Sequence, residues 1–217
     1  MVAVMVKTFA IIAYQIIETL KGSGLRNTFR KMVFIDAETV PVVKDLENAR
    51  SVNDLLKGAN IELVELTKET LPRFKYAYRF KSRLLKVKRN ISKGYKAFAV
   101  VSGKFVIGDI WYVTWETTQH PHLHEDVDLL FLNPGKNDVY MFDMFVDPQQ
   151  RGKNIATALM GSALYNLKQC GYHNAFGFFE MKNIPALWTH RVLKFKELEH
   201  VFFSRYFLKQ LSRKKAG

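Results

Sequence analysis

A buried strand that leads directly into an amphipathic helix is the feature that most restricts how this chain can fold. Val139 to Val146 is almost continuously apolar, and Pro148 ends this strand because proline cannot donate to a neighbouring strand. From Ile155 to Leu167 apolar residues recur at helical spacing, and Gly171 suits a helix end. Ala175 to Phe179 predicts a second strand. A strand–helix–strand unit forms a right-handed crossover between parallel strands, so we expect an α/β fold.

Strands and helices are predicted to alternate along the rest of the chain. Ser102 and Gly103 form the turn of a hairpin, and Gly94 stops the helix before it. These elements predict a mixed sheet with helices on both faces. The other expected elements are strands over Met32–Ile35, Ile61–Leu66, Ala97–Val101, Phe105–Trp115 and Leu198–Phe207, and helices over Val43–Leu56, Leu71–Ile91 and Pro185–Leu193.

The composition is that of an ordinary globular protein with an unusual positive charge. Hydrophobic residues make up 48% of the 217 residues, which excludes a disordered chain, a collagen-like repeat and a disulfide scaffold. Cys170 is the only cysteine, so it forms no internal disulfide and no thiolate metal cluster, and a reducing, cytoplasmic location fits. The net charge of +13 favours nucleic acid, anionic lipid or a phosphorylated cofactor as a partner.

We divide the chain into an N-terminal helical and extended extension (1–59), a main domain (60–210) and a basic C-terminal tail (211–217). The first seventeen residues are apolar, but Lys7 and Gln15 interrupt them and they are too short to span a membrane. A cleaved signal peptide is not expected. Two interpretations stay open: a helix docked on the domain or on a second subunit, and contact of residues 1–31 with a membrane surface through Lys21, Arg26, Arg30 and Lys31.

The turn between the buried strand and the helix has the features of an anion site. The first turn of a helix has free backbone N–H groups and a partial positive charge. Gly152 lets the backbone approach a phosphate closely, and Arg151 and Lys153 add full charges. The spacing matches neither a Walker loop nor the dinucleotide-binding fingerprint. The alternative is a plain turn with solvated cations, and the spacing alone does not decide between the two.

This turn resembles the acyl-CoA signature of the GNAT superfamily of N-acetyltransferases, Arg/Gln-x-x-Gly-x-Gly/Ala after a strand ending in Val-x-Pro. Arg151 and Ala156 match the signature, whereas Asn154 stands where a second glycine is usual. Because asparagine tolerates a left-handed backbone, we expect a distorted loop and not a lost site.

A second segment, from Asn183 to Phe195, also resembles the family. Asn183, Ala186 and Phe195 agree with its pattern, while His190 replaces a tyrosine and Lys194 a glycine. The resemblance runs from about Ile61 to Phe203 in a bacterial-type form with an extra N-terminal segment. It implies a central mixed sheet flanked by helices, with splayed strands at the cofactor site.

The resemblance implies which residues bind acetyl-CoA. Backbone groups of Met144, Phe145 and Val146 pair with the pantetheine arm, and Asn183 reaches the same arm from the following helix. A backbone N–H near Phe145 stabilises the oxyanion when a neutral amine attacks the thioester. The pyrophosphate is held by the loop residues Arg151, Gly152, Lys153, Asn154, Ile155, Ala156 and Thr157.

Catalysis asks for an acid near the thiolate and a base near the amine. His190 is the candidate acid, because it replaces a tyrosine with that role in relatives; the alternative is that it only packs. Asp143 is the candidate that holds or deprotonates the ammonium; the alternative is a structural salt bridge. Glu180 is the second candidate and Tyr140 the third.

Two further segments have alternative interpretations. The loop with His120, His122, His124 and Asp126 has spacing that zinc accepts, but we expect substrate contact there and no metal. The cations and aromatic residues between Arg73 and Lys96 are compatible with nucleic acid, but we expect a basic solvated helix face and no nucleic-acid partner.

The resemblance implies an acetyl-CoA-dependent N-acetyltransferase that acts on a primary amine of a small molecule or a protein. Two other classes stay open. The first is a non-catalytic acyl-CoA-binding or regulatory module, because Asn154 and Lys194 replace signature glycines. The second is a basic membrane- or nucleic-acid-binding protein. A homodimer is also expected from the family.

Overall fold

The computed structural model describes residues 10–18, 34–50, 61–74, 78–118, 122–206 and 209–214. Within them, residues 10–18 form a helix that precedes the labelled elements. The strands are β1 (Phe34–Asp45), β2 (Ile61–Leu66), β3 (Lys96–Ser102), β4 (Phe105–Val113), β5 (Asp138–Val146), β6 (Asn174–Glu180), β7 (Lys196–Glu197), β8 (Val201–Tyr206) and β9 (Lys209–Lys214). The helices are α3 (Leu71–Phe74), α4 (Lys81–Ser92), α5 (Glu125–Leu129), α6 (Ile155–Gln169) and α7 (Ile184–Val192).

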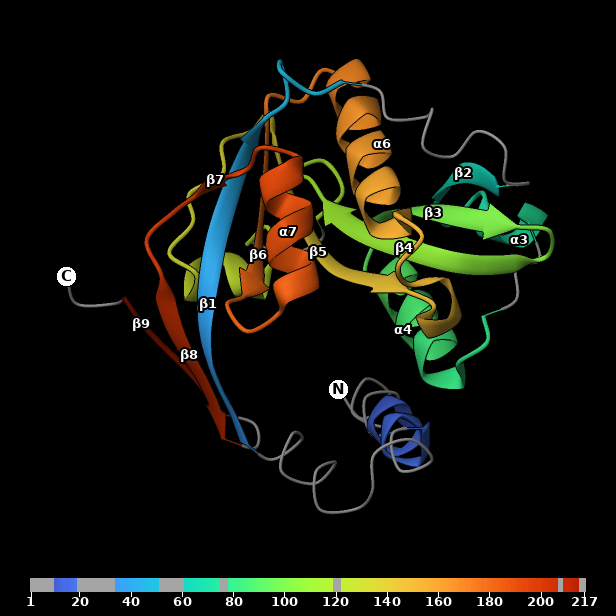
Figure 1. Ribbon diagram of the computed structural model, residues 1–217, viewed down its shortest axis with the longest axis horizontal. Helices are drawn as coiled ribbons and strands as arrows, with labels where there is room; N and C mark the ends of the chain where they lie inside the picture. Colours follow the sequence, from blue (N-terminus) through green and yellow to red (C-terminus); the bar gives the residue numbers. More distant parts are fainter. Residues whose placement is uncertain are drawn as a thin grey trace.

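The strands form one mixed sheet with the order β2-β3-β4-β5-β6-β1-β8-β9, and β7 pairs with β1 (Figure 1). Neighbouring strands are antiparallel except β5 and β6, which are parallel. The α/β class, the mixed sheet, the hairpin of β3 and β4 and the parallel pair around α6 are therefore confirmed.

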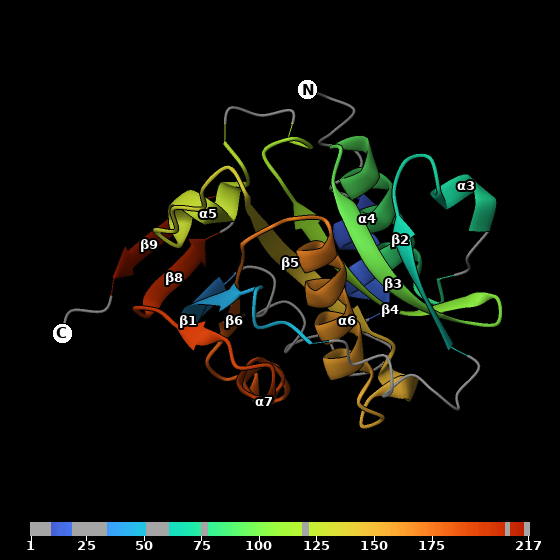
Figure 2. The same cartoon turned by 90° about the horizontal axis from the view of Figure 1, so that it is seen from above.

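Helices cover both faces of this sheet, as expected. Figure 2 shows α6 and α7 on one face and α4 and α5 on the other. The alternation of β4 explains the two layers: Ile110 and Tyr112 belong to the core with α6, whereas Trp111 and Val113 face the core with α4 and α5. Each face of the sheet thus has its own apolar core.

Three expectations are wrong in their extent. The helix predicted over Val43–Leu56 is contradicted at its start, because β1 runs from Phe34 to Asp45 and Val40 and Val42 are fully buried against neighbouring strands. Residues 32–33 and 51–60 lie outside the described part. The single helix over Leu71–Ile91 is two helices, α3 and α4, because Phe80 is extended before α4 begins. Residues 209–214, partly in the predicted tail, form β9 beside β8. The strand predicted over Leu198–Phe207 is confirmed as β8, and the short strand β7 precedes it.

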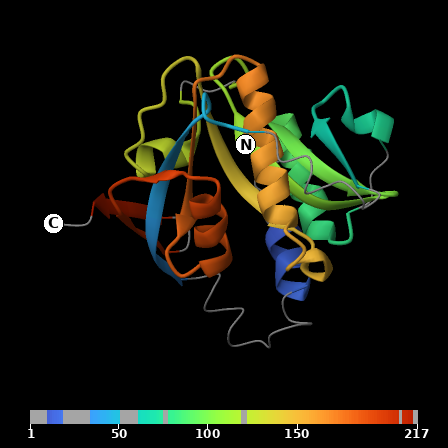
Figure 3. The same cartoon turned by 45° about the horizontal axis from the view of Figure 1, so that its top comes forward.

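The predicted extension contributes to the main sheet as well. β1 lies between β6 and β8, pairing Thr39 with Glu180 on one side and with Val201 on the other. The helix over residues 10–18 contacts α4, where the Glu18 carboxylate accepts from the Ser82 backbone N–H at 3.3 Å (Figure 3). Among the described residues, no helix is long and apolar enough to cross a bilayer. The division at residue 60 and the membrane contact of residues 1–31 stay predictions.

Candidate active site

β5 and β6 diverge halfway along their length and open a gap in the middle of the sheet (Figure 1). Their parallel ladder ends at Tyr140 and Phe176, although β5 continues to Val146 and β6 to Glu180. Beyond this point β5 stays paired with β4, and β6 stays paired with β1. The described strands therefore leave two facing edges open, which is where a ligand can insert as an extra strand.

A bulge in β5 accompanies the divergence. The register between β4 and β5 shifts between Asp109 and Trp111, and Asp143 on β5 has a left-handed backbone with φ 50°. Left-handed backbone is uncommon for residues other than glycine and marks a specified position. Met144, Phe145 and Val146 follow directly and are half-buried. The three residues expected to pair with pantetheine thus lie along the diverging end of β5.

Arg83 of α4 fixes this bulge from inside the protein. Its Nε donates to Asp109 Oδ2 at 3.1 Å, its Nη1 lies 2.9 Å from Asp143 Oδ2, and its Nη2 donates to the Asp143 carbonyl at 2.7 Å. Arg83 is 5% exposed and Asp109 is 0% exposed, and Trp111 Nε1 also donates to Asp109 at 2.9 Å. Two carboxylates and the Lys86 ammonium, 3.2 Å from Asp143, surround one guanidinium, so the cluster is neutral overall.

These contacts determine the protonation of Asp143. Burial acts to raise the pKa of Asp143, but the neighbouring Arg83 and Lys86 cations outweigh it and hold the pKa below its ordinary value. The carboxylate is therefore ionised and occupied by two cations. The structure favours the salt-bridge interpretation of Asp143 over the role of proton acceptor.

The turn between β5 and α6 forms an open cradle. Gly152 has φ 79°, and no atom lies within 4 Å of the position that a Cβ would take there. Asn154 adopts φ 58° at the start of α6, which agrees with the expected left-handed loop. Arg151 and Lys153 are exposed, and Lys153 Nζ donates to Gln150 at 3.1 Å. Exposed N–H groups, two cations and the absence of a Cβ fit a pyrophosphate.

Lys194, at the other departure from the family pattern, also has a left-handed backbone with φ 58°. A glycine is usual at this position, so the lysine adopts a conformation that costs it energy. Asn183 caps α7, where its Oδ1 accepts from the Ala186 N–H at 3.3 Å. Its amide NH₂ group stays available for the role expected of it on the cofactor arm.

A cavity of about 440 Å³ lies between α4, α5 and the strands β5, β6 and β1. Figure 2 shows these two helices on the face opposite α6. A second cavity of about 330 Å³ borders Met144 and Phe145, and the Lys86–Asp143 pair lines both cavities. The larger cavity, called here the acceptor pocket, is thus next to the strand expected to hold the cofactor. It is lined by Ala37, Thr39, Lys86, Arg89, Asn90, Lys93, Tyr95, His124, Glu125, Asp126, Leu129, Leu130, Phe142, Asp143, Phe178, Glu180 and Phe203.

The acceptor pocket contains a carboxylate whose pKa lies near neutrality. Burial, followed by the nearby Glu125 charge, raises the pKa of Asp126 to about 6. The Tyr140 hydroxyl donates to Asp126 Oδ2 at 3.2 Å, and the Asp126 N–H donates to His124 Nδ1 at 3.2 Å. Burial lowers the pKa of His124 to about 4, so this histidine is neutral at pH 7. Asp126 is therefore the titratable group of the pocket that responds near physiological pH.

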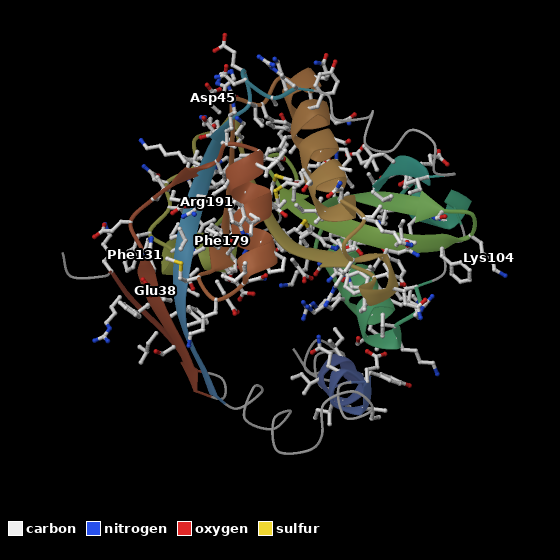
Figure 4. The ribbon with its side chains drawn as sticks, in the orientation of Figure 1. Glu38, Asp45, Lys104, Phe131, Phe179 and Arg191 are labelled. Carbon is white, nitrogen blue, oxygen red and sulfur yellow. The ribbon has the colours of Figure 1, made fainter. Side chains whose placement is uncertain are left out.

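The pocket brings together Asp143 and Glu180 but not His190. His190 is 6% exposed, does not line either cavity, and packs with ring centroids 5.0 Å from Phe179 and 4.8 Å from Phe195. Figure 4 shows Phe179 beside α7. His190 Nδ1 lies 2.7 Å from the Ala186 carbonyl oxygen, and burial lowers the His190 pKa. A neutral, enclosed imidazole suits packing better than proton donation.

The sequence analysis placed Arg89 and Lys93 on a solvated helix face and expected substrate contact for the loop that ends at Asp126, but it did not bring these residues together in one pocket. It did not identify Asn90, an uncharged residue of the same pocket. His120 lies outside the described residues, and His122 pairs with Asp128 at 3.3 Å on the surface. Within the described part of the chain, no three metal-ligating side chains gather into one group.

We compared the chain with protein families, with curated proteins and with solved structures. A model of the acetyltransferase (GNAT) family matches residues 65–195. None of the curated proteins matches the chain. Solved structures that match include a glucosamine N-acetyltransferase region of a fungal multi-domain β-N-acetylglucosaminidase, with 13% identity, a TM-score of 0.53 and coverage of 86% of this chain and 22% of that one.

A GNAT-family acetyltransferase from Novosphingobium aromaticivorans matches with 12% identity and a TM-score of 0.50, covering 85% of this chain and 69% of its own. An aminoglycoside N-acetyltransferase in complex with CoA matches with 16% identity and a TM-score of 0.44, covering 64% and 93%. The chain spans 52%, 22% and 65% of the lengths of three matched structures. At these identities, the two structures with a TM-score of 0.50 or more show a similar fold and nothing further. The family model covers more than half of the chain, including β5, the turn into α6 and α7, so the protein belongs to the GNAT family of acetyltransferases, which use acetyl-CoA.

Proposed function

We propose that this protein transfers an acetyl group from acetyl-CoA to a primary amine that binds in the acceptor pocket. The observation that carries the proposal is the shared wall of the two cavities. The Lys86–Asp143 pair separates the acceptor pocket from the cavity along Met144 and Phe145, so an amine in the pocket lies close to the diverging end of β5. Proximity of this kind is the main contribution that a direct transfer needs from the protein.

The chain supplies the binding groups on the other side of the gap. Acetyl-CoA contributes an activated thioester when it is bound. Backbone groups of Met144, Phe145 and Val146 would hold its arm, and an N–H near Phe145 would stabilise the negative charge that develops during the transfer. Asn183 contacts the arm from α7. The loop from Arg151 to Thr157 holds the pyrophosphate through backbone N–H groups and two cations.

Asp126 is our proposed base, and Glu180 is the second candidate. Both line the acceptor pocket, and the raised pKa of Asp126, about 6, suits proton transfer at pH 7. An ionised Asp126 accepts the proton of the bound ammonium directly or through a water. Asp143 instead positions the bulge, because Arg83 and Lys86 occupy its carboxylate.

Calorimetry and a thiol-release assay test the proposed function. We expect the purified full-length chain to bind acetyl-CoA and CoA, and to release free thiol from acetyl-CoA when a primary amine from a panel is added. Binding without release for every amine would indicate a non-catalytic acyl-CoA-binding module. No binding of either compound would contradict the proposed site itself.

A variant of His190 tests the role that the family pattern suggests for it. His190→Phe keeps an aromatic ring between Phe179 and Phe195 and removes the titratable nitrogens. Because His190 is enclosed, we expect thiol release to be retained. A loss of several hundredfold with unchanged acetyl-CoA affinity would restore His190 as the acid.

The proposal also includes the oligomeric state, the location and the membrane contact of the protein. We propose a homodimer, a cytoplasmic location and a surface contact of residues 1–31 with anionic membranes. Light scattering tests the first, and flotation with vesicles of anionic and neutral lipid tests the last.

A further inference from the structure

One wall of the acceptor pocket is a row of positive and donor groups on α4. Lys86, Arg89, Asn90 and Lys93 follow helical spacing and all line the pocket. Lys86 is already paired with Asp143 at 3.2 Å. Lys93 lies 5.7 Å from the Tyr95 ring centroid, and no ion pair of the described residues joins Arg89 or Lys93 to a carboxylate. Neither of these two charges is therefore held in a close ion pair by the residues that the structure describes.

Two buried donors in this wall also have no hydrogen-bond partner among the described residues. They are Nδ2 of Asn90 and Nε of Arg89. Asn90 is only 2% exposed, and both side chains line the same pocket. Buried donors are almost always satisfied in folded proteins, so an unsatisfied pair beside a cavity points to a ligand that accepts hydrogen bonds. Both groups are donors, which selects an anion or another oxygen-rich group.

The opposite side of the pocket is acidic. Glu125 and Asp126 come from α5 and Glu180 from the end of β6. His124 also faces the pocket, but its lowered pKa leaves it neutral at pH 7. A simple amine would satisfy only this acidic side, and its positive charge would leave the α4 wall unmatched. A ligand with both charges satisfies both sides at once.

We propose that the acceptor amine carries an anionic group, a carboxylate or a phosphate monoester, which binds to Arg89, Asn90 and Lys93 while Glu125, Asp126 and Glu180 face its ammonium group. This inference rests on the proposed function, because it names the class of amine that the transferase accepts. A volume of about 440 Å³ is that of a site for a small metabolite. The anion explains the α4 wall, which catalysis itself does not require.

Matched pairs of amines test the proposal with the full-length protein. Ethanolamine is compared with L-serine, which adds a carboxylate, and with O-phosphoethanolamine, which adds a phosphate. Glucosamine is compared with glucosamine 6-phosphate, and cadaverine with L-lysine. We expect tighter binding by calorimetry, and a higher kcat/KM in thiol release, for the anionic member by about tenfold or more, the scale of one charge-assisted hydrogen bond. The carboxylate and phosphate arms show which anion is preferred.

Variants of α4 connect this preference to the pocket. Arg89→Met and Lys93→Met each lower the preference for the anionic amine by about tenfold, whereas Lys88→Met, on the exposed side of the same helix, leaves it unchanged. Asn90→Leu removes the buried donor and gives a third measurement. If Arg89→Met does not fold, Lys93→Met carries the test, because Lys93 is the capping residue at the end of α4 and not part of its interior. Equal binding within every pair, or a preference that survives both charge removals, overturns the proposal.

Binding and turnover separate this inference from the proposed function. Thiol release that favours the members of the pairs without an anionic group would retain the transferase and reject the anionic acceptor. Tight binding of O-phosphoethanolamine or L-serine that Arg89→Met abolishes, without any thiol release, would retain the anion site and reject the transferase.

Discussion

Replacing Arg83 with methionine removes the guanidinium that joins α4 to the bulge of β5. Asp109 would lose its guanidinium partner and keep the Trp111 Nε1 donor at 2.9 Å while remaining fully buried, and the Asp143 carbonyl would lose its 2.7 Å bond. Breaking a buried ion pair on one side costs about 3–5 kcal/mol, because the remaining charge has neither solvent nor a partner. Since Arg83 serves two carboxylates and a carbonyl, we expect a loss in the upper half of this range.

Urea unfolding of matched arginine variants measures this loss. Arg191→Met is the control, because Arg191 pairs with Glu197 at 3.0 Å while 53% exposed, on the surface of α7 (Figure 4). An exposed pair of this kind contributes less than about 1 kcal/mol. Asp143→Asn should cost an intermediate amount, since Arg83 keeps Asp109. If Arg83→Met lowered the free energy of unfolding no more than Arg191→Met, the neutral buried cluster would not stabilise the bulge and our account of β5 would be wrong.

Three other predictions concern the site and its backbone. Reversing charge with Arg151→Glu and Lys153→Glu should weaken acetyl-CoA binding by about tenfold or more in calorimetry, while Lys214→Glu on β9, the edge strand at the other end of the sheet, should not. Unchanged affinity in the double variant would contradict the cradle. Asp126 must be ionised to act as a base and its pKa is about 6, so kcat/KM should fall tenfold per pH unit below about pH 6. Asp126→Asn should have a low kcat/KM that does not show this decrease. If the variant kept the decrease of the wild type, the decrease would belong to another group. Lys194→Gly should raise the free energy of unfolding by about 0.5–1 kcal/mol, because φ 58° suits glycine, and a lower midpoint in urea would contradict this.

Contiguous features of the site could be predicted from the sequence. The change from apolar run to helical periodicity located the start of α6 at Ile155, and Gly152 and its neighbouring cations identified the turn, because all of them lie within one short segment. The left-handed Asn154 followed from the preference of asparagine for this conformation. The residues that form this turn are adjacent in the sequence, so the sequence alone indicates the site.

The acceptor pocket could not be predicted, because its groups come from distant parts of the chain. Arg89 and Asp126 face the same cavity only after α4 and α5 pack on one side of the sheet. The burial of His190 between the rings of Phe179 and Phe195 also depends on tertiary packing, and the residues next to His190 in the sequence do not indicate it. Most of β1 was missed for a related reason: only Phe34 and Ile35 fall within the predicted strand, and the remaining apolar residues acquire strand partners from distant β6, β7 and β8.

The central position of β1 has a consequence for how the protein is made. On the ribosome, β1 emerges before either of its neighbours, and Glu180 and Val201, which pair with Thr39, are translated long after it. Val40 and Val42, which are fully buried in the folded protein, therefore stay unpaired in the nascent chain until β6 and β8 have been synthesised. Contacts between such distant segments form slowly. The sheet is complete only when β6 and β8 have paired with the two edges of β1. Until then, a chaperone that binds unfolded segments would protect β1 from aggregation.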